Sequence, residues 1–260
     1  MKETGSLVKM VITGATGYLG SRIASYYQDE YRIFTPAHEQ IDICDKENTR
    51  KYLNWINQDI IVHCAAVSDV AECEKNPEMS GKINVLGSYH IASTARELGA
   101  KCILCSSDQV YFGSKKPTSH HENESLTPCS EYGKQKLRME DICLNENPDA
   151  VILRLAWMYD IFTHTACEHM DFIKVLMNRL EDEGELCYPI HDKRGITDVN
   201  EVVVNIQKLF SLPGGVYNFG AENHKNMYDT VVRVLEKLGI DNKRCIETEM
   251  PLQIIREICV

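Results

Sequence analysis

Residues 10–20, which read Met-Val-Ile-Thr-Gly-Ala-Thr-Gly-Tyr-Leu-Gly, decide the fold. The apolar, β-branched run 8–12 predicts a buried parallel strand, and residues 19–28 predict a helix. Between them, Gly14 permits a tight turn, Gly17 lets the backbone approach a diphosphate, and Gly20 lets helix and strand pack closely. The alternative is a glycine-rich turn without a ligand. We expect a dinucleotide site made by Gly14, Ala15, Thr16, Gly17, Tyr18, Leu19 and Gly20.

The rest of the first 160 residues alternates predicted strands and helices, which indicates an α/β Rossmann fold with a doubly wound parallel sheet. We assign 1–160 to a dinucleotide-binding domain that also carries the catalytic residues. Residues 161–260 are assigned mostly to a small substrate-binding lobe, with some segments returning to the main sheet. Further strands are predicted at 31–35, 59–64, 101–105, 150–155 and 216–219. Further helices are predicted at 46–58, 79–98, 130–144, 171–180, 199–210 and 228–238.

Composition excludes several classes of protein. The 260 residues carry a formal net charge of −10 without a basic cluster, which argues against a nucleic-acid binder. No run of about 18 apolar residues predicts a membrane span, and residues 1–9 lack the apolar core of a secretory signal. The eleven cysteines are scattered, mostly in apolar runs, so we read them as reduced core residues of a cytoplasmic protein. Cys102 and Cys105 have the spacing of metal ligands but no partner pair, so we expect no metal.

A candidate catalytic set follows the fourth predicted strand. Ser106 and Ser107 end that strand, and Tyr132 and Lys136 lie four residues apart on the next helix, hence on one face. A phenol has a pKa near ~10, and a nearby ammonium is expected to lower it toward the working range. Ser107, Tyr132 and Lys136 thus suit proton transfer to a carbonyl oxygen, whereas Tyr-x-x-x-Lys without this context usually means two surface residues. Asp108 is either a turn cap or a substrate contact.

The Gly-x-x-Gly-x-x-Gly turn, His63-Cys64-Ala65-Ala66 and the Ser/Tyr/Lys set resemble the extended branch of the short-chain dehydrogenase/reductase superfamily. Within it, Ser107-Asp108-Gln109-Val110-Tyr111 and Arg154-Leu155-Ala156-Trp157-Met158-Tyr159 look most like dTDP-4-dehydrorhamnose reductases. The resemblance is strong over 8–160 and weak over 161–260, where Asp192-Lys193-Arg194-Gly195 keeps only part of the family pattern. It implies cofactor contacts from Asp42, Ile43, Ala65, Ala66, Asn84, Ser106, Tyr132 and Lys136, and substrate contacts from Val67, Asp108 and Trp157. Asp42 could instead flank or cap a helix, and Trp157 could be a packing residue.

The resemblance implies an NAD(P)H-dependent reductase of a 4-keto sugar nucleotide, with Tyr132 as proton donor. NADP(H) is favoured over NAD(H), because the second strand ends in Thr35, Pro36, Ala37 and His38 without an acid, and Arg22 could accommodate a 2′-phosphate. Two other functions stay open: a sugar-nucleotide epimerase or dehydratase, or a non-catalytic regulatory subunit like the beta subunit of methionine adenosyltransferase. The expected partner is a small sugar nucleotide, not a nucleic acid or membrane, and a homodimer is compatible with the family.

Overall fold

The computed structural model describes residues 7–114, 116, 118–160, 171–182 and 185–249. The chain divides into two compact units, which we describe separately. Of the described residues, the larger unit comprises those within 7–155 and 199–219, and the smaller one those within 156–160, 171–198 and 220–249. None of the helices that the structure describes has the length and apolar character needed to cross a membrane.

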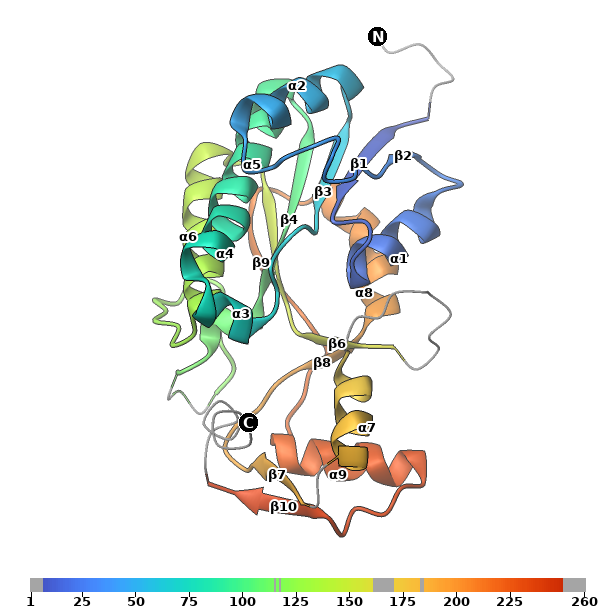
Figure 1. Ribbon diagram of the computed structural model, residues 1–260, viewed down its shortest axis with the longest axis vertical. Coiled ribbons are helices and arrows are strands. Elements are labelled where there is room, and N and C mark those ends of the chain that lie inside the picture. The colour runs from blue at the N-terminus through green and yellow to red at the C-terminus, as the bar shows by residue number, and fades with distance from the viewer. Residues whose placement is uncertain (1–6, 115, 117, 161–170, 183–184, 250–260) are drawn as a thin grey trace. The chain divides into compact units, whose positions relative to one another are not determined.

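The larger unit is built on a parallel sheet of six strands, in the order β2-β1-β3-β4-β5-β9 (Figure 1). From β1 the chain first adds β2 on one side and then crosses to β3 on the other. The strand order therefore reverses between β1 and β3, and ligands of open α/β sheets bind outside the carboxyl ends of the strands at such a point. The strands are β1 (Lys9–Thr13), β2 (Arg32–Phe34), β3 (Ile60–His63), β4 (Lys101–Ser107), β5 (Val151–Leu155) and β9 (Gly215–Phe219).

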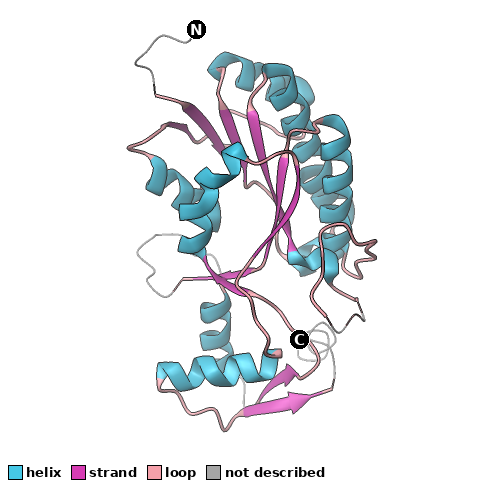
Figure 2. Cartoon of the chain, turned by 180° about the vertical axis from the view of Figure 1, so that it is seen from behind, coloured by secondary structure: helices cyan, strands magenta, loops and turns pink. Residues whose placement is uncertain are grey.

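Helices cover both faces of this sheet, as Figures 1 and 2 show. α2, α5 and α6 pack on one face, over a core that includes Val11, Ile61, Ile91, Leu104 and Met139, and α1 and α8 pack together on the other. The predicted α/β doubly wound fold is confirmed. The helices are α1 (Tyr18–Tyr27), α2 (Lys46–Ile56), α3 (Val70–Lys75), α4 (Pro77–Gly81), the π-helical turn η1 (Lys82–Gly87), α5 (Ser88–Leu98), the 3₁₀ turn η2 (Asp108–Tyr111), α6 (Glu131–Glu146), α8 (Val199–Asn205) and the 3₁₀ turn η3 (Ile206–Ser211).

Local sequence explains where these helices begin and end. Asp45 and Ser130 cap the N-termini of α2 and α6, because their side chains accept hydrogen bonds from Asn48 N and Gly133 N. Gly99 ends α5 in the left-handed region at φ 63°, where glycine carries no steric penalty. This is the glycine stop that the sequence predicts.

The structure differs from the expected elements in several places. The helix expected over 79–98 begins at Pro77 and contains the π-helical turn η1, and the one expected over 199–210 is α8 followed by 3₁₀ turn η3. The helix α3 and the short strands β6, β7, β8 and β10 were not expected. The second strand is limited to Arg32–Phe34, three of the five residues expected at 31–35.

The smaller unit contains two two-stranded parallel sheets, β6 with β8 and β7 with β10, and two helices. Its core joins Phe172, Leu176, Tyr188 and Val231. Trp157 packs edge-on against Phe172 at 5.1 Å between ring centroids, and the Arg194 guanidinium lies 5.4 Å from the Trp157 ring. The elements are β6 (Trp157–Tyr159), α7 (Phe172–Asp182), β7 (Leu186–Pro189), β8 (Ile196–Asp198), α9 (Met227–Leu238) and β10 (Cys245–Thr248).

Candidate active site

Glycine stands at each of the three positions of the first turn for a different physical reason. Gly14 adopts φ 68°, and a Cβ there would lie 2.6 Å from Ala65 N, so the turn lies directly against the segment after β3. A Cβ at Gly20 would lie 2.4 Å from Gly14 O. Gly17 adopts an ordinary φ of −82°, and its Cβ would meet only Gly14 O, at 3.2 Å. The fold itself requires Gly14 and Gly20, whereas the open space at Gly17 fits a ligand that approaches the backbone.

The remaining residues of this turn divide by exposure. Thr16 is exposed, whereas Tyr18 and Leu19 are buried, so these two can offer a ligand their backbone N–H groups at the start of α1. Arg22 is also buried, donates to Tyr18 O at 2.8 Å and stacks on the Tyr18 ring at 4.1 Å. The expectation that Arg22 accommodates a 2′-phosphate is therefore wrong, because its guanidinium is committed inside the fold.

Hydrogen bonds of a buried histidine connect the end of β3 to β1 and α5. His63 Nδ1 lies 2.6 Å from Thr13 Oγ1 on β1, and His63 Nε2 lies 3.1 Å from Ser88 Oγ on α5. Burial, together with the nearby Lys136 ammonium, lowers the pKa of His63 to about 3, so the ring stays neutral. Its hydrogen bonds fix the strand end after which the half-buried Ala65 lies against Gly14 of the glycine turn, and Ala66, the next residue, is also half-buried.

Asn84 joins the segment after β3 to the helix of the catalytic set. Its side chain accepts from Val67 N at 2.8 Å, donates to Val67 O at 3.0 Å, and donates to Gln135 Oε1 at 2.8 Å. Gln135 in turn donates to Ser80 Oγ at 2.8 Å. Sequence reasoning missed Gln135, although it lies next to Lys136 on α6. The buried network shows Asn84 as a structural link between Val67 and the start of α6.

Local packing brings Tyr132 to Ser107. A Cβ at Gly133 would lie 2.5 Å from Gln109 O, so this glycine lets the first turn of α6 approach the 3₁₀ turn that follows Ser107. Ser107 Oγ accepts from Gln109 N at 3.2 Å as the cap of that turn. Ser107 and Tyr132 interact through their side chains. The structure thus places together two of the three residues that the sequence singles out as catalytic.

Lys136, the third member, lies beside them. Its Nζ is 5.6 Å from the Tyr132 ring centroid and donates to Cys105 O at 2.9 Å. The thiols of Cys105 and Cys64, at the ends of neighbouring strands, are 3.8 Å apart. Only 3% of Lys136 and 8% of Tyr132 are exposed, so the set lies in a largely desolvated part of the larger unit.

This burial determines the protonation state of Tyr132. Burial raises the pKa of Tyr132 above its ordinary value, and the hydrogen bond with Ser107 acts in the opposite direction without overcoming it. Burial also lowers the pKa of Lys136. The expectation that the ammonium lowers the pKa of Tyr132 toward the working range is therefore wrong for this structure, because desolvation of the phenolate dominates. Burial thus disfavours ionisation of the phenol in this structure.

The side chain of Ser106 points away from this set, to a buried ion pair. It donates to Glu140, which receives two further bonds from Arg154, Nε to Oε1 at 3.0 Å and Nη2 to Oε2 at 2.6 Å. Arg154 Nη1 also donates to Tyr111 OH at 2.6 Å, and that hydroxyl donates to Asn218 Oδ1 at 2.6 Å. The network links β4, α6, β5 and β9. It leaves the backbone of Ser106 as the part available to a cofactor.

The structure shows which roles the carboxylates of Asp42 and Asp108 have in local caps and turns. Asp45, not Asp42, caps α2, and the Asp42 carboxylate instead accepts from Cys44 N at 2.9 Å. Asp108 begins η2, and Ser107 Oγ lies 3.4 Å from its carboxylate oxygen. Both carboxylates thus remain candidates for ligand contacts.

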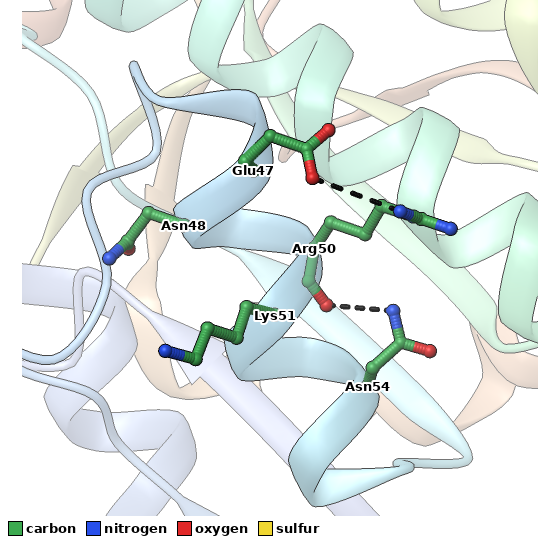
Figure 3. A pocket seen from close by; sticks show the side chains of 5 residues that line it. All are labelled: Glu47, Asn48, Arg50, Lys51 and Asn54. Carbon is green, nitrogen blue, oxygen red and sulfur yellow. Dashed lines mark hydrogen bonds and ion pairs between the residues drawn. The ribbon is translucent and has the colours of Figure 1, made fainter.

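A hollow of about 480 Å³ on the outer side of α2 does not belong to this site (Figure 3). It is lined by one helix, with an ion pair between Glu47 and Arg50 at 3.8 Å. Among the described residues, no group of three or more His, Cys, Asp or Glu side chains is placed to hold a metal ion. The lining residues are Glu47, Asn48, Arg50, Lys51 and Asn54.

A parallel sheet with a glycine turn at its switch point, and a Ser, Tyr and Lys set at the same carboxyl edge, is the arrangement of an extended short-chain dehydrogenase/reductase enzyme. The family model described as RmlD substrate binding domain matches residues 8–254, and the chain belongs to this family. The fold, family and enzyme class expected from the sequence are thereby confirmed.

The relatives include proteins with two different names. A dTDP-4-dehydrorhamnose reductase of Mycolicibacterium smegmatis is 30% identical over 239 residues, covering 91% of this chain and 71% of that protein. The methionine adenosyltransferase 2 subunit beta of Rattus norvegicus is 32% identical over 159 residues, 58% of this chain and 47% of that protein. The structure of a Bacillus anthracis dTDP-4-dehydrorhamnose reductase in complex with NADP superimposes with a TM-score of 0.84 at 22% identity, covering 98% of this chain and 87% of that one.

Proposed function

We propose that this chain is a nicotinamide-dependent reductase that converts the keto group of a 4-keto sugar nucleotide to an alcohol. The observation that carries the proposal is the meeting of Ser107, Tyr132 and Lys136 at one edge of the sheet, where Tyr132 and Lys136 are buried and Lys136 Nζ lies 5.6 Å from the Tyr132 ring centroid. A reductase of such a substrate is also what the Mycolicibacterium smegmatis relative is named.

Each residue of the set has a distinct role in this proposal. Bound at the glycine turn, a reduced nicotinamide supplies the hydride. Tyr132 donates its proton to the carbonyl oxygen of the sugar. Ser107 donates a hydrogen bond that orients the same oxygen. Lys136 stabilises the phenolate left by the transfer and binds the nicotinamide ribose.

The residues around the glycine turn fit a dinucleotide. Gly17 leaves open space where a diphosphate approaches the backbone, and the first turn of α1 presents N–H groups without a side-chain cap. Further along the same edge, Ala65 and Ala66 leave room for the riboses, and Asp42 with Ile43 contacts the adenine. The backbones of Ala15, Thr16, Tyr18, Leu19 and Ser106, and the position of Asn84, complete the proposed binding site.

NADP(H) is proposed over NAD(H). The exposed residues beyond β2, Thr35, Ala37 and His38, include no acid to accept bonds from a free 2′-hydroxyl. The related Bacillus anthracis structure contains NADP. The preference is modest, because Arg22 is buried and committed to Tyr18.

Val67, Asp108 and Trp157 are proposed to contact the sugar nucleotide. In the larger unit, Val67 and Asp108 lie next to Asn84 and Ser107, respectively. The smaller unit is proposed as the substrate-binding lobe, with Trp157 as its sugar contact. In the described residues Trp157 packs on Phe172 and Arg194, so its substrate role rests on the family resemblance.

A regulatory role is the second candidate, favoured by the likeness to the methionine adenosyltransferase beta subunit over 159 residues. A single experiment separates the candidates. The purified protein is incubated with NADPH and 4-keto sugar nucleotides and, in parallel, with NAD⁺ or NADP⁺ and 4-hydroxy sugar nucleotides, and absorbance at the nicotinamide band is followed with product analysis. Stoichiometric NADPH oxidation supports the reductase. Conversion of a hydroxy sugar without net oxidation indicates an epimerase or dehydratase, and tight cofactor binding without any turnover indicates the regulatory subunit.

A further inference from the structure

The loop of residues 41–45, proposed above to contact adenine, is tied to two different helices. On the α2 side, Asp42 N donates to Asn48 Oδ1 at 2.7 Å, and Thr49 Oγ1 donates to Asp42 O at 3.0 Å. Figure 3 shows Asn48 pointing away from the Glu47–Arg50 ion pair of the same helix. These bonds fix the backbone on both sides of the Asp42 peptide.

The second tie comes from α5. His90, which is 6% exposed, has its Nδ1 2.9 Å from Ile43 O. A carbonyl oxygen only accepts, so Nδ1 must carry the proton and donate. One residue of the adenine loop is thus held through its backbone oxygen by a buried imidazole that the catalytic set does not use.

Gly87, one turn before His90, explains how the helix comes so close. A Cβ at Gly87 would lie 2.8 Å from Ile43 Cδ1 and 2.9 Å from Ile43 Cγ1. The Ile43 side chain therefore packs directly on the helix backbone. His90 holds the carbonyl and Gly87 receives the side chain, which leaves Ile43 little freedom to move.

The close approach occurs at the π-helical turn η1, a type of turn that is frequent at functional sites. Asn84, in this same turn, bonds both backbone groups of Val67. One irregular turn thus supports two segments that flank the proposed cofactor site, the adenine loop and the segment after β3.

We propose that His90 is a positioning residue for the adenine half of the cofactor, acting through Ile43 O and together with Gly87. The inference rests on the proposed cofactor site and goes beyond it, since His90 touches only the loop. An apolar side chain would fill the same buried space, whereas the imidazole adds a directional bond to one carbonyl. Loss of one such bond is worth about 2- to 10-fold in an equilibrium constant.

The test compares His90→Leu, which removes the donor, with His90→Asn, whose amide nitrogen can replace Nδ1. Affinity for 2′,5′-ADP, the adenine half alone, is measured by calorimetry, and turnover is measured with NADPH and with reduced nicotinamide mononucleotide, which lacks adenine. We expect His90→Leu to weaken 2′,5′-ADP binding and raise the KM for NADPH about 2- to 10-fold, with kcat and the mononucleotide kinetics unchanged. His90→Asn should restore most of the affinity.

Tyr89→Phe is the matched control, because it removes a 3.0 Å hydrogen bond to Glu146 from the neighbouring residue of α5 without touching the loop. If His90→Leu does not fold, as judged by thermal melting, the cycle of Gly87→Ala, Ile43→Ala and the double variant replaces it. Gly87→Ala should weaken 2′,5′-ADP binding more in the presence of Ile43 than in its absence.

Wild-type 2′,5′-ADP affinity in a folded His90→Leu protein, or an equal loss for the mononucleotide, would overturn the positioning role and leave the proposed function intact. Additive effects in the Gly87 cycle would do the same. A wild-type protein that binds neither NADPH nor 2′,5′-ADP would instead overturn the cofactor site itself, and the role of His90 with it.

Discussion

The two ends of the proposed cofactor site differ in how deeply their residues are buried and in how extensively those residues are hydrogen-bonded. At the nicotinamide end, Tyr132 and Lys136 are almost fully buried and joined to buried hydrogen-bond networks. At the adenine end, Thr35, His38 and Asp42 are exposed. The contrast indicates that chemistry depends on a few desolvated groups, whereas affinity for the adenosine half is spread over weaker contacts. Substitutions should therefore have steep effects at one end and graded effects at the other.

The steepest effect is expected from Tyr132→Phe. The ring packing is kept and the proton donor removed, so kcat should fall about 10²- to 10⁴-fold, while melting temperature and NADPH affinity stay near wild type. Steady-state kinetics with the best 4-keto substrate measures this. Wild-type turnover in the folded variant would contradict Tyr132 as the proton donor.

Gly17→Val tests the proposed diphosphate site, which lies between the nicotinamide and adenine ends of the cofactor site. The backbone angles of Gly17 suit any residue, and one atom lies near its Cβ position, so the variant should fold. Its branched side chain should occupy the ligand space and weaken NADPH binding about 100-fold, or roughly 2.7 kcal/mol. Gly20→Ala is the contrasting control, since its Cβ would lie 2.4 Å from Gly14 O and should destabilise the fold instead. Unchanged NADPH affinity in Gly17→Val would mean that the turn has been misinterpreted.

Ser107→Ala should have a smaller effect than Tyr132→Phe. It removes an orienting hydrogen bond but leaves the proton donor, so we expect kcat/KM for the sugar to fall about tenfold. The variant also removes the acceptor for Gln109 N, so circular dichroism should accompany the kinetics. A larger loss than for Tyr132→Phe would reverse the assigned roles.

The smallest effect concerns the adenine end. Since residues 35–38 directly after β2 include no acid, and since Arg22 is buried, NADPH should be preferred over NADH by only a few-fold in kcat/KM, about one kcal/mol. Initial rates with both cofactors test the preference, and His38→Ala should reduce it if the imidazole faces the phosphate. A clear preference for NADH would contradict the assignment and point to Thr35 or His38 on free ribose hydroxyls.

The sequence predicts the nucleotide-binding half well because its signals are local. The glycine turn, the Gly99 stop and the spacing of Tyr132 and Lys136 each depend on residues within a few positions of one another. The contacts of Arg22 and the pKa of Tyr132 were misjudged because both depend on burial, which no local pattern reveals.

Short elements of the smaller unit escaped prediction for a similar reason. β6 and β8 have three residues each and are stabilised by pairing with each other across a long stretch of chain. His90 and Gln135 belong to no recognisable sequence motif, because their hydrogen-bond partners, Ile43 and Asn84, are distant in sequence. A buried polar residue on an otherwise apolar helix face was the only available signal.

The edge strand β9 has a consequence for how the molecule is made. It pairs with β5, and Tyr27 OH on α1 donates to Val203 O on α8, yet β6, α7, β7 and β8 of the smaller unit are encoded between β5 and α8. A ribosome must therefore make this part of the smaller unit before the larger one can close its sheet. Until then β5 is an unpaired edge and α1 lacks its neighbour, a state open to intermolecular strand pairing. Chaperone dependence during synthesis should accordingly end once residue 219 has left the ribosome.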